Sequence, residues 1–383
     1  MMDSTRRIML IAGEPSGDRI ASRAVRATKR LAFALGVKLE VFGIAGDECM
    51  AEGVECLHTS SAMSVVGFVE VARRFRFFRD VLHEMTKLLD DRRPDVLLLI
   101  DYPGFNIRLA REAKKRGIRV VYYVSPQVWA WHASRVQELK EVVDEMLVIF
   151  PFEEKLYRDA GLTNAHFVGH PIVERIEEER RGFRDRETFA GHYGLDPWKD
   201  WLLVFPGSRT EEVRRLLPTM SLAAQDFAAR HGMQSILVES GSIEPSHYAA
   251  YLRAPLTNFR DSNATHELMS HARLGILKSG TTTLEAALLG LPGVICYRTH
   301  PATFFIGKRL VKLPYIGLAN IVLGQKLYPE LLQNDVIPSK VASELEGVFA
   351  RYDEFKSALG GLADTLRASG VPPSERVAQS LLV

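Results

Sequence analysis

The sequence contains few cysteines, and their number and spacing argue against a fold held together by disulfides. There are three in 383 residues: Cys49, Cys56 and Cys296. An odd and sparse set of thiols is typical of a protein in a reducing compartment. Cys49, Cys56 and His58 lie close enough in sequence to begin a zinc site, but no second Cys/His cluster completes it. We therefore expect neither disulfides nor a bound metal.

Long apolar runs and an excess of one charge are also missing. The N-terminal run IMLIAG ends at Glu14, too early for the core of a signal peptide. No other run approaches the roughly 20 residues of a membrane span. Lys and Arg number 49 and Asp and Glu 47, a formal charge of +2, so no overall field attracts nucleic acid. We expect a cytoplasmic protein without a membrane span or a nucleic-acid partner.

What the sequence does contain is a regular alternation of short apolar runs and helical patterns. The runs typical of buried parallel strands are 8–12, 95–100, 120–124, 145–150, 201–205, 235–239, 274–278 and 293–297. This alternation predicts an α/β protein with two doubly wound, Rossmann-like domains facing across a cleft. Residues 170–197 are dense in charge and are interpreted as the crossing between the domains. The predicted division is 1–172, 173–345 and a helical segment, 346–383, that could pack back on the first domain.

The strand-to-helix turns of the first half carry the polar residues of interest, because open α/β sheets bind ligands at the carboxyl ends of their strands. GEPSGD (13–18) is either a tight turn in which Asp18 caps the next helix or a ligand loop. DYPGFN (101–106) places Asp101 directly after an apolar strand. Burial there raises proton affinity, which suits a general base, although a helix cap is the alternative. In SPQVWAWHASR (125–135), Trp129 and Trp131 form either an aromatic platform or part of the core.

Two turns of the second half are suited to phosphate. PGSRTEE (206–212) offers donors from Gly207 and Ser208 at a helix start, and Arg209 can fork onto a phosphate. SGTTTLEAALLGLP (279–292) gathers small hydroxyls and amides where a helix dipole favours anions. Its candidate residues are Ser279, Gly280, Thr281, Thr282, Thr283 and, for a ribose diol, Glu285. Thr282 and Glu285 also match a capping box, so a structural role stays open.

Taken together, these motifs are similar to those of a known family. GEPSGD, DYPGFN, SPQVWAW, VGHP (168–171), PGSR, KSGTTTLEAALLGLP and LANIVLGQKLYPELLQ (318–333) resemble, in order and spacing, the lipid-A-disaccharide synthases. The resemblance covers residue 8 to about 340. Gly104 stands where an acidic residue is common in that family, and Gly293 where Met is common.

The resemblance implies a GT-B glycosyltransferase fold whose second domain holds a UDP-sugar. It implies transfer of 2,3-diacylglucosamine from UDP to the 6-hydroxyl of 2,3-diacylglucosamine 1-phosphate, with inversion and without a cofactor. Asp101 would be the base, Arg209 and the 279–283 loop would hold the diphosphate, and Glu285 the ribose. Further residues expected on the nucleotide side are Asn320 and Glu330, and on the acceptor side Glu14, Ser16, Asn106, Gln127 and Trp129. No DxD motif for a divalent metal occurs in the chain.

The segment FVEVARRFRFFRDVLHEM (68–85) is apolar on two sides when read at helical pitch. One stripe, Phe75, Phe78 and Leu82 among others, is expected to face the core. Because both implied substrates carry acyl chains, the second side is interpreted as a peripheral contact with the cytoplasmic face of the inner membrane. Burial by a loop or by a second subunit of a homodimer is the alternative. The expected membrane residues are Val66, Val69, Arg73, Phe77 and Val81.

Three other functions compete with this interpretation. A UDP-N-acetylglucosamine 2-epimerase would share the architecture and the nucleotide loop, but it needs no surface for acyl chains. A non-catalytic lipid- or nucleotide-binding protein would leave Asp101 unexplained. A nicotinamide-dependent dehydrogenase is disfavoured because the GxGxxG fingerprint is absent.

Overall fold

The computed structural model divides the chain into two compact units. The first comprises Met1–Glu174 and Leu366–Val383, and the second Arg175–Thr365. The structure describes residues 5–63, 75–126, 135–301, 304–305, 313–368 and 370–382. The division differs from the predicted one at two places. Residues 173–174 belong to the first unit, and residues 346–365 belong to the second, whereas 366–383 return to the first.

The first unit is built on a parallel sheet in which seven strands are described, in the order β3-β2-β1-β4-β5-β6-β7. The strands are β1 (Thr5–Ala12), β2 (Lys38–Ala45), β3 (Glu55–Thr59), β4 (Val96–Ile100), β5 (Arg119–Tyr123), β6 (Glu145–Val148) and β7 (Ala165–Phe167). The helices are α1 (Pro15–Ala34), α2 (Asp47–Ala51), α3 (Ser60–Met63), α5 (Phe75–Asp91), α6 (Pro103–Lys115), α8 (Arg135–Val142), α9 (Pro151–Asp159) and α21 (Pro373–Leu382). Helix α10 (Pro171–Arg180) crosses from this unit into the next.

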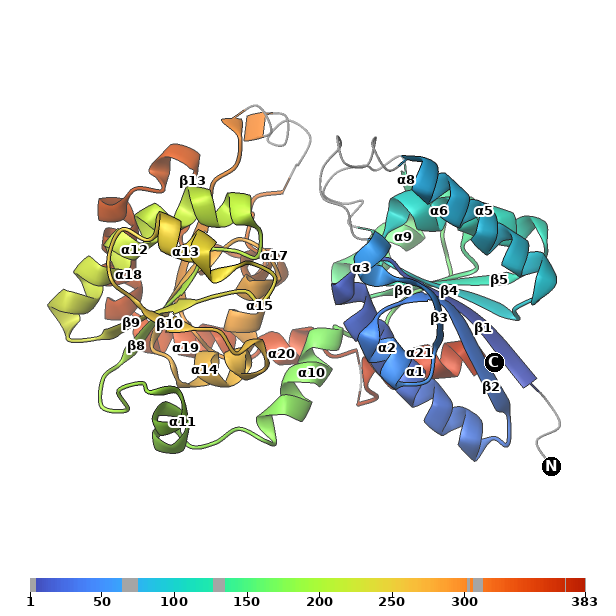
Figure 1. The fold of residues 1–383 in the computed structure, drawn as a ribbon, viewed down its shortest axis with the longest axis horizontal. Coiled ribbons are helices and arrows are strands. Elements are labelled where there is room, and N and C mark those ends of the chain that lie inside the picture. Colours follow the sequence, from blue (N-terminus) through green and yellow to red (C-terminus); the bar gives the residue numbers. More distant parts are fainter. Residues whose placement is uncertain are drawn as a thin grey trace. The chain divides into compact units, whose positions relative to one another are not determined.

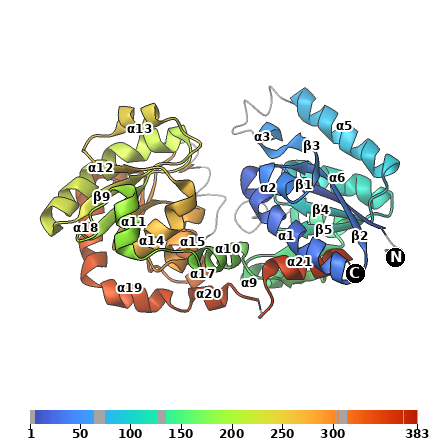
Figure 2. The same ribbon diagram turned by 60° about the horizontal axis from the view of Figure 1, so that its bottom comes forward.

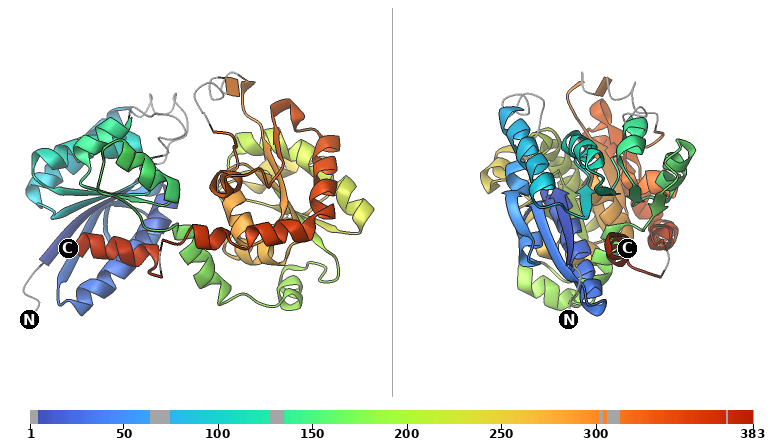
Figure 3. Two further views of the ribbon diagram at one scale, coloured as in Figure 1. Left: turned by 180° about the vertical axis from the view of Figure 1, so that it is seen from behind. Right: turned by 90° about the vertical axis from the view of Figure 1, so that its right-hand side faces the viewer.

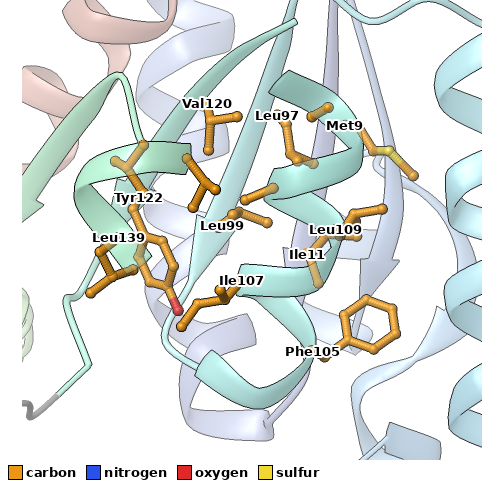
Figure 4. Packing of buried hydrophobic residues seen from close by; sticks show 14 of the residues in the cluster. Met9, Ile11, Leu97, Leu99, Phe105, Ile107, Leu109, Val120, Tyr122 and Leu139 are labelled. Atoms are coloured by element: carbon orange, nitrogen blue, oxygen red, sulfur yellow. The ribbon is translucent and has the colours of Figure 1, made fainter. Parts of the chain in front are cut away.

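Helices cover both faces of this sheet, as its apolar strands require. Figure 2 shows α5 and α6 on one face and α1 with α21 on the other. The C-terminal helix α21, red in Figure 3, packs along α1 of the same unit. Figure 4 shows the core between the sheet and α6, where Leu97 and Leu99 of β4 meet Ile107 and Leu109. The polar turns therefore follow strands that are packed in this core.

The second unit repeats the plan with six described strands, in the order β10-β9-β8-β11-β12-β13 (Figure 1). The strands are β8 (Trp201–Phe205), β9 (Gln234–Val238), β10 (Thr257–Phe259), β11 (Leu274–Lys278), β12 (Gly293–Tyr297) and β13 (Glu330–Leu332). The helices are α11 (Arg186–Tyr193), α12 (Thr210–His231), α13 (Pro245–Tyr251), α14 (Thr265–His271), α15 (Thr281–Leu288), α17 (Leu318–Leu323), α18 (Pro338–Ala350), α19 (Tyr352–Leu359) and α20 (Leu362–Thr365). Buried residues of α12, α13 and α18 pack on one face of the sheet. The fold class predicted from sequence is confirmed: both units are parallel, doubly wound α/β domains.

The prediction that α5 has a membrane-facing side is wrong where the helix is described. Val81 is 3% exposed and lies in the core with Met85 and Leu89, one and two turns farther along. Phe77 is half-buried against the same cluster. The helix has one broad apolar face, turned to its own sheet, rather than two narrow ones. The other expected membrane residues, Val66, Val69 and Arg73, lie outside the described residues. Among the described helices, none is long and apolar enough to cross a membrane.

The two positions that depart from the family pattern should respond oppositely to alanine. Gly293 of β12 pairs with Gly275 of β11, and a Cβ at 293 would lie 2.1 Å from the Gly275 carbonyl oxygen. Gly293→Ala should therefore cost about 1–3 kcal/mol of unfolding free energy. A Cβ at Gly104, inside the first turn of α6, meets nothing within 4 Å. Gly104→Ala should be neutral or stabilising by up to about 1 kcal/mol. Urea unfolding of both variants checks this, and equal shifts would contradict the crowding argument.

Candidate active site

Asp101 lies in a strained turn directly after β4. Both Asp101 and Tyr102 have positive φ angles, 45° and 49°, a conformation that side-chain-bearing residues adopt mainly where surrounding structure enforces it. Tyr102 is the N-cap of α6, so the alternative in which Asp101 caps this helix is wrong. The Tyr102 ring lies against Gly13, where a Cβ would come within 2.6 Å of it. The glycine of the first turn thus makes room for the turn that carries Asp101.

Side chains fix this turn by donating hydrogen bonds to main-chain carbonyl groups. The Asp101 carbonyl oxygen accepts hydrogen bonds from the Tyr122 hydroxyl at 2.5 Å and from Asn106 Nδ2 at 2.7 Å. The Tyr102 hydroxyl donates to the Met63 carbonyl at 2.9 Å. Asn106 is fully buried and holds the backbone, so the expectation that it faces the acceptor is wrong. Its Nδ2 holds the main chain at Ile100 and Asp101.

The environment of Asp101 favours the protonation behaviour of a general base. Burial, and next the nearby negative charge of Glu14, raise the pKa of Asp101 to about 6. Glu14 is the exposed N-cap of α1, and Ser16 is exposed in the first turn of that helix. The structure therefore brings Glu14 and Asp101 into electrostatic contact at the carboxyl ends of adjacent strands. Gln127 and Trp129 lie outside the described residues.

Two buried carboxylates beside this turn have structural roles. Asp18, expected to cap α1, instead accepts hydrogen bonds from the main-chain N–H groups of Gly46, Glu48 and Cys49 and so caps α2. Glu153, which sequence reasoning missed, accepts from the Ser125 hydroxyl at 2.9 Å and from the Phe150 N–H at 3.1 Å. Its position at the third residue of α9, just after Pro151, is the signal that could have identified it as a cap.

In the second unit, the loop after β8 places Arg209 at the start of α12. Gly207 has a φ of 121°, and a Cβ there would lie 2.4 Å from the Glu212 carboxylate. Glu212 accepts a hydrogen bond from the Ser208 N–H at 3.1 Å and pairs with Lys278 at 2.8 Å. The Ser208 N–H, predicted to bind phosphate, is therefore occupied by Glu212. Arg209 is the exposed N-cap and, within the described part of the chain, its guanidinium has no ion pair.

The loop after β11 starts α15 on the neighbouring strand. Gly280 is the N-cap, so the proposed capping box between Thr282 and Glu285 does not form. The Ser279 hydroxyl donates to the Ile316 carbonyl at 3.0 Å, and the Thr283 hydroxyl to the Gly280 carbonyl at 2.8 Å. Both hydroxyls are buried and hold the loop itself. The remaining candidates are Thr281 and Thr282, with their main-chain N–H groups, because the Thr283 N–H already donates to the Gly280 carbonyl.

These two loops lie side by side because β8 and β11 are adjacent and parallel. The N-termini of α12 and α15 are thus at the same edge of the sheet, and each contributes positive partial charge there. Lys278 at the end of β11 is 22% exposed, but its charge is paired with Glu212 at 2.8 Å. Such an edge is suited to two linked phosphates.

Asn320 and Glu330, expected near the nucleotide, are brought together, but their polar atoms are used within the protein. Asn320 is fully buried; its Nδ2 donates to Glu330 at 2.9 Å and to the Tyr328 carbonyl at 2.8 Å. Glu330 also accepts from the N–H groups of Ile316 and Gly317, at 3.0 and 2.9 Å. Glu330 thus holds the chain just before α17, where Ser279 also binds Ile316, and Asn320 holds the chain that follows the helix.

Glu285 meets a histidine that sequence reasoning missed. His266 of α14 lies between two carboxylates, with Nδ1 2.6 Å from Glu179 and Nε2 3.4 Å from Glu285. Burial opposes the charge on His266, but the hydrogen bonds to Glu179 and then Glu285 outweigh it and raise its pKa. Burial would raise the pKa of Glu179, yet the bonds from His266 and Arg175 lower it to about 2. No sequence motif links three residues on separate helices, so this cluster was not predictable.

Comparison with known proteins places the chain by sequence. The family model described as lipid-A-disaccharide synthetase matches residues 8–356. The lipid-A-disaccharide synthase of Trichlorobacter lovleyi is 41% identical over 357 residues, covering 92% of this chain and 90% of the relative. That of Geobacter sulfurreducens is 38% identical over 389 residues, covering 99% and 97%.

Comparison with solved structures places the fold. The kitacinnamycin glycotransferase matches with a TM-score of 0.64 at 16% identity, covering 99% of this chain and 97% of that one. A UDP-GlcNAc 2-epimerase from Neisseria meningitidis bound to UDP-GlcNAc matches with a TM-score of 0.61 at 11% identity, covering 99% and 98%. At such identities the likeness shows the fold alone, which is the two-domain GT-B arrangement.

Proposed function

The chain belongs to the lipid-A-disaccharide synthase family of glycosyltransferases, and on this premise we propose how its residues carry out the transfer. The donor is UDP-2,3-diacylglucosamine, and the acceptor is the 6-hydroxyl of 2,3-diacylglucosamine 1-phosphate. The products are a β-1′,6-linked disaccharide 1-phosphate and UDP. The epimerases are similar in fold only, whereas the relatives by sequence are synthases.

The single observation that carries the mechanism is the environment of Asp101. A carboxylate with a pKa of about 6 is ionised at neutral pH yet is a stronger base than an ordinary aspartate. We assign it the removal of the proton from the attacking 6-hydroxyl. Its main chain is anchored by Tyr122 and Asn106, so the carboxylate is positioned by a rigid turn. The reaction is proposed to be a single in-line displacement, and an α-linked donor then gives a β-linked product.

The second unit is proposed to stabilise the departing UDP. Negative charge grows on the diphosphate as the glycosidic bond breaks, and fixed positive groups aimed at it lower the barrier. Arg209 and the N-termini of α12 and α15 supply such groups at one edge of the sheet. We propose that they act without a divalent metal, because the chain has no DxD motif to hold one. Glu285 is assigned to the ribose diol.

We also propose that the protein acts at the cytoplasmic face of the inner membrane. Both substrates carry two acyl chains and therefore lie in or beside a bilayer. The described part of α5 faces its own core, so the contact is assigned to Val66, Val69 and Arg73 at the start of that segment. Apolar residues next to arginine suit an anionic interface.

The decisive test follows UDP release by the purified protein in mixed detergent–phospholipid micelles. With both lipids present, UDP and disaccharide should form in equal amounts. With the donor alone, UDP release should be negligible. Release of UDP from the donor without the acceptor would instead indicate epimerase-type elimination and would overturn the assignment. Addition of EDTA should leave the rate unchanged if the reaction needs no divalent metal.

A further inference from the structure

His266 lies between the carboxylates of Glu179 and Glu285, and Glu285 is the residue assigned to the ribose. His266 comes from α14, Glu179 from α10 and Glu285 from α15, and all three residues belong to the second unit. The His266 side chain is only 4% exposed. The mechanism above does not use it, and a buried ionisable group with two charged partners calls for a physical explanation.

The contacts of the imidazole favour one protonation state. Nδ1 makes a hydrogen bond with Glu179 at 2.6 Å, and Nε2 lies 3.4 Å from Glu285, an ion-pair distance. An imidazolium carries an N–H at both positions and is attracted to both carboxylates, whereas a neutral imidazole leaves one nitrogen lone pair facing negative charge. Glu179 is in turn bonded by Arg175 at 2.7 Å, which completes the order Arg175, Glu179, His266, Glu285. Positive and negative side chains alternate in this row of four residues, and the last of them, Glu285, is 18% exposed.

Only one oxygen of the Glu285 carboxylate contacts His266. Glu285 Oε1 faces His266, and within the described residues Oε2 has no hydrogen-bond partner. A carboxylate held by one oxygen and open at the other can accept hydrogen bonds from a ligand hydroxyl in a fixed direction. Without His266, the Glu285 carboxylate would lose the contact at Oε1 and the neighbouring positive charge.

We propose that His266 is a positioning residue for nucleotide recognition: through Nε2 it orients Glu285 toward the ribose hydroxyls of the donor, with Glu179 fixing the imidazole from behind. This inference rests on the proposed function, since it presupposes that Glu285 contacts the ribose. It adds to that function a source of selectivity for a nucleoside diphosphate that has its 2′- and 3′-hydroxyls. His266 itself touches no substrate, so its effect should appear only in the part of the affinity that depends on those hydroxyls.

The test compares binding of UDP with binding of 2′,3′-dideoxy-UDP by calorimetry. The wild type should prefer UDP by about tenfold or more, the value of a hydrogen bond to a charged group. His266→Asn keeps a donor near the Nδ1 position but none near Nε2, so it should lose most of this preference while binding dideoxy-UDP as the wild type does. His266→Gln keeps a donor near Nε2 and should retain part of the preference. Glu179→Gln should lower it to an intermediate value.

The matched control is His271→Asn, on the same helix. The His271 imidazole faces the Arg184 carbonyl at 3.1 Å rather than Glu285, so the UDP preference should be unchanged. Equal weakening of both nucleotides by His266→Asn, or no weakening of either, would overturn the inference. So would a wild type that binds both nucleotides equally. If His266→Asn does not fold, Glu179→Gln decides alone, because an unchanged preference there also contradicts the proposal. Acceptor-dependent UDP release by the wild type tests the proposed function separately.

Discussion

Asp101→Asn should lower kcat for disaccharide formation by about 10²- to 10⁴-fold, the usual contribution of a general base. Asparagine has the shape of aspartate but cannot accept the proton of the 6-hydroxyl. The turn should survive, because Tyr122 and Asn106 bind the main-chain carbonyl of residue 101 and not its side chain. UDP affinity should not change, since the nucleotide is assigned to the second unit. Steady-state assays and calorimetric UDP binding measure the two quantities separately.

The pH dependence gives this prediction its control. Activity needs the ionised carboxylate, so kcat/KM of the wild type should fall as the pH drops through about 6, the pKa of Asp101. Glu14 contributes to raising that pKa. Glu14→Gln removes its charge and should therefore move the acid limb to lower pH without abolishing activity. An Asp101→Asn enzyme that keeps its rate, or an acid limb that does not respond to Glu14→Gln, would remove Asp101 from the chemistry.

The strands that sequence predicted well are those buried on both faces. The runs 201–205, 274–278 and 293–297 coincide with β8, β11 and β12, because a central parallel strand is apolar along its whole length. The strands that were not predicted from the sequence lie at or near the edges of the sheets. β2 carries Lys38 and Glu40 in its more exposed half, which breaks the apolar run, and β10 and β13 are three residues long. The charged crossing 170–197 likewise contains the helices α10 and α11.

The sequence identified the turns that carry polar residues, but it did not identify the partner of each polar side chain. Asp101 could be singled out because a carboxylate after an apolar strand has few structural partners. Asn320 and Glu330 are equally polar, but they bind each other and the neighbouring main chain. The partner of a side chain depends on where distant segments pack, and a single sequence does not state that. The buried side of Val81 was missed for the same reason: it depends on the position of α5 against the sheet.

Arg209→Ala should reduce kcat by about 10²- to 10³-fold, comparable with the loss of one charged donor from a transition-state site. Two neighbouring groups are already occupied, since Glu212 binds both the Ser208 N–H and Lys278. Arg209 is therefore the cation of this loop that is available to a ligand among the described residues. Its main chain begins α12 without a side-chain cap bond, so the helix should persist in the variant.

The pattern of kinetic constants separates this role from simple substrate binding. Negative charge on the diphosphate increases in the transition state. The fold-decrease in kcat of the variant should therefore exceed the fold-increase in its KM. Arg209→Lys should recover only part of the rate, because an ammonium cannot make the paired contacts of a guanidinium. Arg214→Ala is the matched control, because that exposed arginine one turn along is already paired with Glu211. A rise in KM at constant kcat would mean that Arg209 binds the ground state and the transition state equally well. The helix N-termini alone would then stabilise the negative charge that grows on UDP.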